Sequence, residues 1–259
     1  MKLSIITANY NNSSSILSCL DSMVNNLKEL DYEIIVVDNY SKDESCRLVR
    51  EKYSNFNIIE NKKNFGFARA INQGFKNTNG KYLMILNPDV KMASGLIEQL
   101  IKYMDDHPDV GLLLPKLINP DGSLQLSCRT FYNFSTLLFR KSPLGKIFPN
   151  HKVIRKHLLM DWNHEEVREV DWGLGACMIM RRNALTDGKI LDDRFFLYFE
   201  DVDLCLRLKK AGWKIIYYPN VVMTHHHTRQ SARGFFNRAK WEHFKSLIKF
   251  YSKHKRFAL

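Results

Sequence analysis

Apolar runs alternate with amphipathic segments along residues 1–118 of the chain. The runs are continuous, which is typical of parallel strands that are covered on both faces. In the segments between them apolar residues recur every three or four positions, which predicts helices. The predicted strands are 3–9, 32–39, 55–61, 81–87 and 109–117, and the predicted helices are 13–30, 41–53, 65–78 and one capped by Ser94 that runs to 106. This order predicts an α/β fold with a Rossmann-like, mostly parallel central sheet flanked by helices.

The pattern changes after the turn signal NPDG at residues 119–122. Residues 141–168 are rich in Lys and His and show little periodicity, so we expect a loop-rich, mobile insertion there. The later expected elements are a loop leading into a strand at 169–182, a helix at 200–211 closed by Gly212, strands at 213–219 and 220–227, and a basic amphipathic helix at about 235–254. We therefore expect one domain over residues 1–231, with halves 1–118 and 119–231, and a helical tail at 232–259.

Composition narrows the class of protein. The chain has 259 residues, 45% hydrophobic, and no apolar run approaches the roughly 20 residues that a transmembrane helix needs. The first residues lack the long apolar region of a signal peptide, and five scattered cysteines form no CxxC pair, so we expect a cytoplasmic protein with buried free thiols. The net charge of +12 favours an anionic partner: nucleic acid, a phosphorylated small molecule or an anionic membrane. Basic residues are dense from Arg229 to Arg256, where Glu242 is the single acid.

Polar residues stand where the predicted strands end. Ligands of parallel sheets bind beyond the carboxyl ends of the strands, so Asn9, Asp38, Asn39 and Asp89 become candidates for one site. Asp38 could accept hydrogen bonds from a base or a ribose, although an Asx turn would explain either acid alone. Asp89 follows Pro88 and suits a hard divalent cation such as Mg²⁺ or Mn²⁺, which prefers oxygen ligands and keeps several waters.

Two glycine-containing segments could also contact a ligand. In NKKNFGFARAINQG (61–74), Gly66 permits close approach of the backbone, and Arg69 and Asn72 share one face of the predicted helix. The N-terminus of that helix could bind an anion. In VDWGLGACMIM (170–180), two glycines beside Trp172 offer an apolar surface for a sugar ring, although a core tryptophan is equally consistent with the segment.

Acids and histidines in the second half could perform catalysis. Glu200, Asp201 and Asp203 begin a helix, where the helix dipole favours acids. The aromatic residues before them could raise a carboxyl pKa, as a general base requires. In THHHTRQS (224–231), His225 and His226 point to opposite sides of an extended segment. One His and one Asp are too few for structural zinc but suffice for a cation that also binds a diphosphate.

Taken in order, seven blocks of the chain resemble an inverting glycosyltransferase of family 2 with the GT-A fold. They are SIITANYN, VVDN, NFGFARAIN, LNPDV, DWGLGACMIM, FEDVDLCLRLKKAGW and the HHH segment. The resemblance covers residues 3 to about 231, and the blocks are most similar to bacterial rhamnosyltransferases of O-antigen or capsule assembly. It implies a GT-A domain over 1–231, with a nucleotide-sugar half and an acceptor half.

The resemblance also implies a role for each candidate residue. Asp38 is expected on the pyrimidine edge, Asp89 on the cation, and Asp201 as the base that deprotonates the acceptor hydroxyl. Asn87 stands where an acid is usual in the family, which removes one charge from the motif. The implied sets are Thr7, Asn9, Tyr10, Asp38, Asn39, Gly66, Arg69, Asn72 and Asn87 for the nucleotide sugar, Asp89 with His225 or His226 for the metal, and Trp172, Gly175, Ala176 and Glu200 for the acceptor.

The implied activity is transfer of a sugar, with dTDP-L-rhamnose as the preferred donor, to a saccharide acceptor on a polyprenyl diphosphate. UDP- or GDP-sugars remain alternative donors. The C-terminal helix could lie on an anionic membrane or pack on the domain with only its lysines exposed. A nucleic-acid-binding or non-catalytic sugar-binding protein is the alternative class. We expect no nucleic-acid partner because such a protein would not explain the acids at the strand ends.

Overall fold

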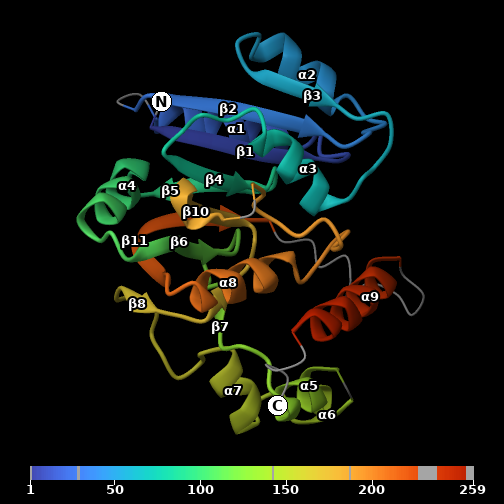
Figure 1. Cartoon of the computed structure of the whole chain (residues 1–259), viewed down its shortest axis with the longest axis vertical. Coiled ribbons are helices and arrows are strands. Elements are labelled where there is room, and N and C mark those ends of the chain that lie inside the picture. Colours follow the sequence, from blue (N-terminus) through green and yellow to red (C-terminus); the bar gives the residue numbers. More distant parts are fainter. Residues whose placement is uncertain (1, 28–29, 142, 187, 227–237, 255–259) are drawn as a thin grey trace.

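The computed structural model describes residues 2–27, 30–141, 143–186, 188–226 and 238–254. Nine strands of this part of the chain form one central sheet, in the order β3-β2-β1-β4-β10-β6-β11-β5, with β8 paired to β11 (Figure 1). Helices cover both faces, as the sequence predicted.

The N-terminal half of the sheet is parallel. Its strands β3, β2, β1 and β4 pair side by side in one direction, and the register sets Asn9 opposite Asp38 at the carboxyl ends. The prediction of buried parallel strands is confirmed for β1, β2 and β4, whereas the edge strand β3 is parallel but partly exposed. The bounds are β1 Leu3–Asn9, β2 Tyr32–Asp38, β3 Asn57–Glu60 and β4 Tyr82–Leu86.

The C-terminal half also contains antiparallel strands, but six of the nine described strands run in one direction, so the expectation of a mostly parallel sheet is confirmed. β10 (Cys177–Arg181) lies antiparallel between β4 and β6 (Val110–Ile118). β11 (Lys214–His225) runs parallel to β6, while β5 (Val90–Ser94) and β8 (Arg168–Glu169) run antiparallel to β11. The predicted strands 213–219 and 220–227 are one strand, whose register to β6 shifts between Tyr218 and Val222.

The helices of the first half exist as predicted, with shorter bounds. Their apolar faces pack on the sheet; α1, for example, buries Ile16, Cys19, Leu20 and Met23. Ser94 does not cap a helix, because it belongs to β5 and Gly95 turns the chain at a φ of 86° before the next helix begins. The bounds are α1 Ile16–Asn25, α2 Ser45–Lys52, α3 Phe67–Phe75 and α4 Ile97–Asp106.

The region after residue 118 is more ordered than its sequence suggested. The NPDG turn is confirmed, since the Gly122 N–H donates to the Asn119 carbonyl at 2.9 Å. The expected loop-rich insertion contains helices, and β7 (Cys128–Arg129) pairs antiparallel with β9 (Trp172–Gly173) in a small second sheet. The remaining helices are α5 Phe134–Lys141, α6 Leu144–Ile147, α7 Lys152–His157, a 3₁₀ turn at Arg182–Ala184, α8 Glu200–Lys210 and α9 Arg238–Lys253.

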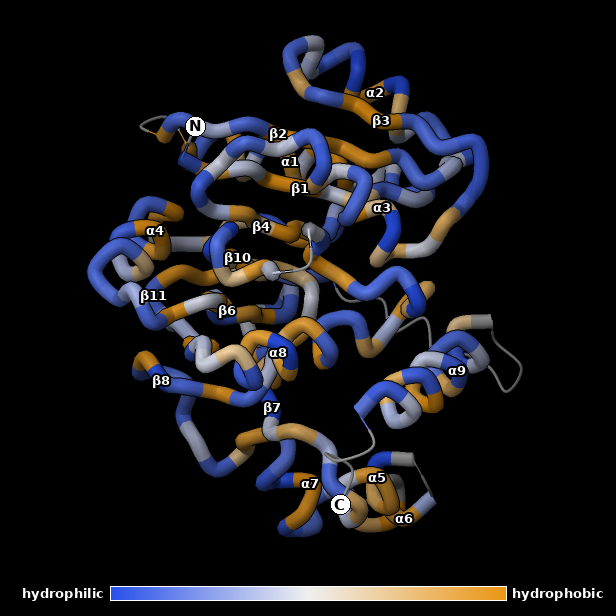
Figure 2. The backbone as a smooth tube through the Cα atoms, in the orientation of Figure 1, coloured by the Kyte–Doolittle hydropathy of each residue, from blue (hydrophilic) through white to orange (hydrophobic). Residues whose placement is uncertain are grey.

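The sheet separates two hydrophobic cores. Alternate residues of β2 enter different cores: Ile35 packs with α3 and α8, while Ile34 packs with α1 and α4. Figure 2 shows the apolar residues gathered on the central strands. α9 joins the first core through Phe250, which is 5% exposed. Among the described residues, the helices are too short or too polar to cross a bilayer.

Candidate active site

The carboxyl ends of β1 and β2 carry a buried polar cluster. The Asn9 Nδ2 donates to Asp38 Oδ1 at 2.9 Å and to the Ser45 hydroxyl at 2.7 Å. The other carboxylate oxygen of Asp38 accepts from the Ser41 N–H at 3.0 Å. Thr7 Oγ1 and Asn9 Oδ1 are buried and have no hydrogen-bond partner among the described residues. Buried polar atoms without partners are costly, so these atoms mark a place for a polar ligand.

Asn39 holds the loop that leads to α3. Its Nδ2 donates to Asn64 Oδ1 and to the Gly66 carbonyl, and its Oδ1 accepts from the Phe65 N–H at 3.0 Å. Gly66 has a φ of 88° and lies so close to Phe196 that a Cβ would meet the Phe196 carbonyl oxygen at 2.6 Å. Gly66 therefore serves close packing against the 190–199 segment. Tyr10 is 46% exposed beside this cluster.

Arg69 and Asn72 have different surroundings, although both lie on α3. Asn72 is buried, and its Oδ1 accepts from the N–H groups of Ile190 and Leu191. Its Nδ2 donates to the Leu191 carbonyl at 2.7 Å, so in this structure the side chain fixes the 190–193 loop. Arg69 is exposed and lines a cavity of about 410 Å³ together with Lys76 and Lys189.

The segment after β4 brings the predicted metal ligands together. His225 Nε2 lies 3.5 Å from Asp89 Oδ1, and His225 Nδ1 lies 2.7 Å from Gln125 Oε1, which fixes the ring. His226 has an exposed side chain, and its backbone N–H donates to the Asp89 carbonyl at 3.0 Å. The Oδ1 atoms of Asn87 and Asp89 are buried and accept no hydrogen bond within the described part of the chain. The geometry favours His225 over His226 as the partner of Asp89.

The acids of α8 are presented by a strained turn. Tyr198 and Phe199 both have left-handed backbones, with φ of 69° and 68°, which costs about 1–2 kcal/mol per residue. Burial raises the pKa of Asp201, against the effect of the Val202 and Gly175 N–H groups, which donate to its carboxylate at 2.8 and 3.2 Å. Burial, followed by the charge of Asp201, raises the pKa of Glu200 well above its usual range.

Gly175 and Ala176 connect the two acidic groups. The Gly175 N–H donates to Asp201 Oδ2, and the Ala176 carbonyl accepts from the Asn87 N–H at 2.8 Å. Consecutive residues thus contact the candidate base on one side and the candidate metal motif on the other. The sequence places these groups more than 100 residues apart, and the fold brings them together at one edge of the sheet.

Trp172 does not offer an open stacking surface. Its side chain is 2% exposed, its Nε1 donates to the Thr130 carbonyl at 2.9 Å, and the Arg129 guanidinium lies 5.1 Å from the ring centre. The sequence analysis missed Arg129 and Gln125, because a single Arg or Gln outside a periodic element gives no local signal.

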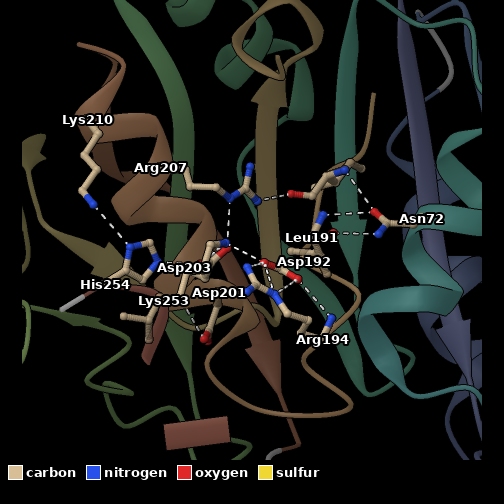
Figure 3. A network of polar contacts seen from close by, with 12 residues as sticks. Asn72, Leu191, Asp192, Arg194, Asp201, Asp203, Arg207, Lys210, Lys253 and His254 are labelled. Atoms are coloured by element: carbon tan, nitrogen blue, oxygen red, sulfur yellow. Dashed lines mark hydrogen bonds and ion pairs between the residues drawn. The ribbon is translucent and has the colours of Figure 1, made fainter. Parts of the chain in front are cut away.

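A network of charges holds α8 in place (Figure 3). Asp203 is fully buried and accepts from Arg207 at 2.9 Å, Lys253 at 2.6 Å and His254 at 2.7 Å. Arg207 also reaches the Ile190 carbonyl, and Lys253 also reaches Asp192. The predicted Asp203–Arg207 pair is confirmed, and α9 contributes the other two partners. The network thereby supports the turn that carries Asp201.

The sheet with its polar carboxyl ends and the acids at the start of α8 defines a GT-A-type α/β protein. The sequence matches glycosyl transferase family 2 over residues 4–161, and the chain belongs to this family of glycosyltransferases. It is 28% identical over 214 residues to an N-acetylglucosaminyl-diphospho-decaprenol L-rhamnosyltransferase of Mycobacterium tuberculosis, covering 77% of this chain and 68% of that protein. It is 26% identical to the rhamnosyltransferase WbbL of Escherichia coli K12, covering 95% and 91%.

Solved structures confirm the fold. GalNAc-T7 crystallised with UDP, GalNAc and Mn²⁺ has a TM-score of 0.64 at 17% identity, covering 87% of this chain and 44% of that one. Residues 1–349 of TarS from S. aureus, in complex with UDP-GlcNAc, have a TM-score of 0.59 at 17% identity, covering 100% and 74%.

Proposed function

We propose that this chain transfers a sugar, with inversion, from a nucleotide diphosphate donor to a hydroxyl of a lipid-linked saccharide in surface polysaccharide synthesis. L-Rhamnose from dTDP-rhamnose is the first candidate, since both relatives described above are rhamnosyltransferases. The observation that supports the proposal is the Gly175–Ala176 connection, in which consecutive residues contact Asp201 and Asn87. A base and a diphosphate site that face one another are what a single displacement requires.

In the proposed reaction Asp201 accepts the proton of the acceptor hydroxyl. The acceptor oxygen forms a bond to the anomeric carbon while the bond from that carbon to the donor diphosphate breaks. The Gly175 and Val202 N–H groups orient the Asp201 carboxylate. Burial raises its pKa, which strengthens it as a base.

A divalent cation fits the residues around Asp89. Asp89 Oδ1 and Asn87 Oδ1 are buried oxygens without donors among the described residues, and His225 Nε2 faces the first of them. Mg²⁺ and Mn²⁺ bind through one or two such groups, keep several waters and contact substrate phosphates. When bound, the cation would neutralise charge that develops on the leaving diphosphate. Asp89 and His225 would hold it, with Gln125 orienting the histidine.

The nucleoside is assigned to the cluster of Thr7, Asn9, Tyr10 and Asp38, with Asn39, Gly66 and Arg69 shaping its surroundings. A UDP-sugar is the alternative donor, because the TarS structure contains UDP-GlcNAc. Glu200, Gly175 and Ala176 lie on the acceptor side. The relative from M. tuberculosis is named for an acceptor on decaprenyl diphosphate, which supports the same class of acceptor here.

The outer face of α9 supports a peripheral position on the cytoplasmic membrane. Trp241, Phe244 and Ile248 are 57%, 51% and 53% exposed, and Lys240 and Lys249 are exposed beside them. Ser246 and Phe250 face inward, so α9 packs on the domain and presents apolar residues as well as lysines. Phe235 and Phe236, which the sequence analysis assigned to this helix, lie outside the described residues.

The test is a panel of dTDP-, UDP- and GDP-sugars with a short-chain N-acetylglucosaminyl diphospholipid, with and without Mn²⁺. We expect product with one donor, detected by mass spectrometry, and an increase in melting temperature with the matching nucleoside diphosphate and Mn²⁺. Asp201→Asn should lose about 10²–10⁴-fold in rate and keep the nucleotide-induced increase.

Transfer at the normal rate by Asp201→Asn would refute the assignment of the base. Absence of transfer and of stabilisation with every nucleotide, together with stabilisation by an oligonucleotide, would refute the proposed class. Glu51→Gln, an exposed acid on α2, serves as the control that should keep full activity.

A further inference from the structure

Arg129 is a cation beside the candidate base. It lies on β7, opposite Trp172 of β9, and its guanidinium covers the Trp172 ring at 5.1 Å from the ring centre. Its Nε is buried and has no hydrogen-bond partner within the described part of the chain. A buried donor on a charged group costs free energy when it is left unpaired, so the site is built for a missing acceptor.

Arg129 acts on the groups of the reaction centre. Its positive charge lowers the pKa of Asp201, against the effect of burial, and it also opposes the burial that raises the pKa of Tyr132. Asp201 in turn raises the pKa of Tyr132. The three side chains therefore lie within electrostatic range of one another, and an anion bound by Arg129 would stand close to the reacting hydroxyl.

The position of Arg129 separates it from the donor phosphates. The proposed donor site, at Asn87, Asp89 and His225, adjoins Ala176, whereas Arg129 pairs with the strand that precedes Gly175. The chain from Arg129 runs through Tyr132 to α5, where Phe134 and Leu138 are 68% and 46% exposed. In the α6 region Ile147 and Phe148 are exposed as well. The segment that carries Arg129 thus continues from the neighbourhood of the base to a helix with exposed apolar residues.

We propose that Arg129 binds the diphosphate that joins the acceptor sugar to its lipid. This inference rests on the proposed function, since it requires a lipid diphosphate acceptor. The diphosphate lies between the sugar and the hydrocarbon chain of such a molecule, and the segment that carries Arg129 leads from the neighbourhood of Asp201 to the exposed residues of α5. The planar guanidinium, which lies over the Trp172 ring, can bind two phosphate oxygens at once.

The experiment compares two acceptors that carry the same lipid: an N-acetylglucosaminyl diphospholipid and the alkyl N-acetylglucosaminide without the diphosphate. Wild type, Arg129→Gln and Arg129→Lys are assayed at a pH on the plateau of each profile, because Arg129 also affects Asp201. For Arg129→Gln we expect kcat/KM to fall about 10- to 100-fold on the diphosphate acceptor, through KM, as for a lost charged hydrogen bond. On the alkyl glycoside the fall should be less than about 3-fold, since no diphosphate contact is removed. Arg129→Lys should recover part of the loss.

Arg168→Gln is the matched control, since the Arg168 guanidinium covers the Trp162 ring at 5.0 Å on another strand. It should leave both acceptors unchanged. Equal losses on both acceptors, or loss of nucleotide-induced stabilisation in Arg129→Gln, would overturn the assignment of Arg129 while leaving the proposed function intact. A wild-type enzyme that uses neither acceptor with any donor would overturn both.

Discussion

At the scale of single residues, the candidate ligand contacts are the buried polar atoms that have no hydrogen-bond partner among the described residues. Asn9 and Asp38 are joined to one another and to serines, yet Asn9 Oδ1 and Thr7 Oγ1 stay unpaired among the described residues. Asp89 and Asn87 show the same feature beside His225. Asp89 carries a charged carboxylate and Asn87 a neutral amide, so substitution of each should affect metal binding differently.

We expect Asp89→Ala to abolish the Mn²⁺-dependent part of the nucleotide-induced increase in melting temperature, because it removes the charged ligand. Asn87→Ala should keep that increase, since the amide contributes no charge. Gln125→Leu should weaken Mn²⁺ affinity about 10- to 100-fold by freeing the His225 ring. Mn²⁺ titration followed by differential scanning fluorimetry measures all three. An Asp89→Ala variant that keeps the full increase would contradict the metal assignment.

At the scale of elements, α9 is tied to α8 through a buried histidine as well as through ion pairs. Burial lowers the pKa of His254, against its contacts with Asp203, so the ring is neutral at neutral pH. A neutral ring with its proton on Nε2 donates to Asp203 at 2.7 Å and accepts from Lys210 at Nδ1, 3.3 Å away. His254 therefore binds a proton less readily in the folded chain than in the unfolded chain.

This gives a pH dependence with a definite sign. Below the unfolded pKa of about 6.5 the unfolded chain binds a proton that folded His254 does not, so stability should fall as the pH decreases. We expect the free energy of unfolding in urea to decrease more between pH 7.5 and 5.5 for the wild type than for His254→Gln. At pH 7.5 the variant should be less stable by about 1 kcal/mol through its altered hydrogen bond.

The exposed His107 provides the control: His107→Gln should keep the wild-type pH dependence. A wild type and a His254→Gln variant with parallel profiles would show that His254 does not carry this dependence.

At the scale of the whole molecule, the sequence predicted what local patterns encode. Continuous apolar runs identified β1, β2, β4 and β6, and the residues at their ends identified Asp38 and Asp89. The insertion of β10 between β4 and β6 was not predictable, because pairing between distant strands leaves no mark on local periodicity. β5 was not predicted, and its last residue, Ser94, was taken for the cap of the helix that begins after Gly95.

The site was predictable in part for the same reason. Acids at strand ends and at the start of a helix can be recognised from the neighbouring sequence. The surroundings of Arg129 cannot, because they are formed by Trp172 and Asp201, which lie far along the chain. The expectation for 141–168 of a loop-rich region omitted α6 and α7, because these helices are too short to show periodicity. Short helices of this kind are recognised only by what they pack against, and here they lie next to α5 (Figure 1).

Exposed apolar residues occur on α9 and in the α5–α6 region. α9 and the α5–α6 region lie near one another at one end of the molecule, away from α4 (Figure 1). Trp241, Phe244 and Ile248 on α9 together with Phe134 and Ile147 expose large apolar side chains there. Basic side chains beside them suit an anionic bilayer, to which each Lys or Arg near the surface contributes about 1 kcal/mol.

We therefore expect the full chain to bind vesicles that contain phosphatidylglycerol, and to bind less as salt increases because the lysine contribution is screened. Replacing Trp241, Phe244 and Ile248 together by Ser should reduce the partition coefficient at least about 10-fold, since each buried apolar side chain contributes about 1.5–3 kcal/mol when fully inserted. Leu96→Ser, at an exposed apolar position beside α4, is the control and should bind as the wild type does. Co-sedimentation measures the partition, and urea unfolding checks that each variant is folded. A folded triple variant with unchanged binding would refute the role of α9 and leave the exposed apolar residues of the α5–α6 region as the membrane contact.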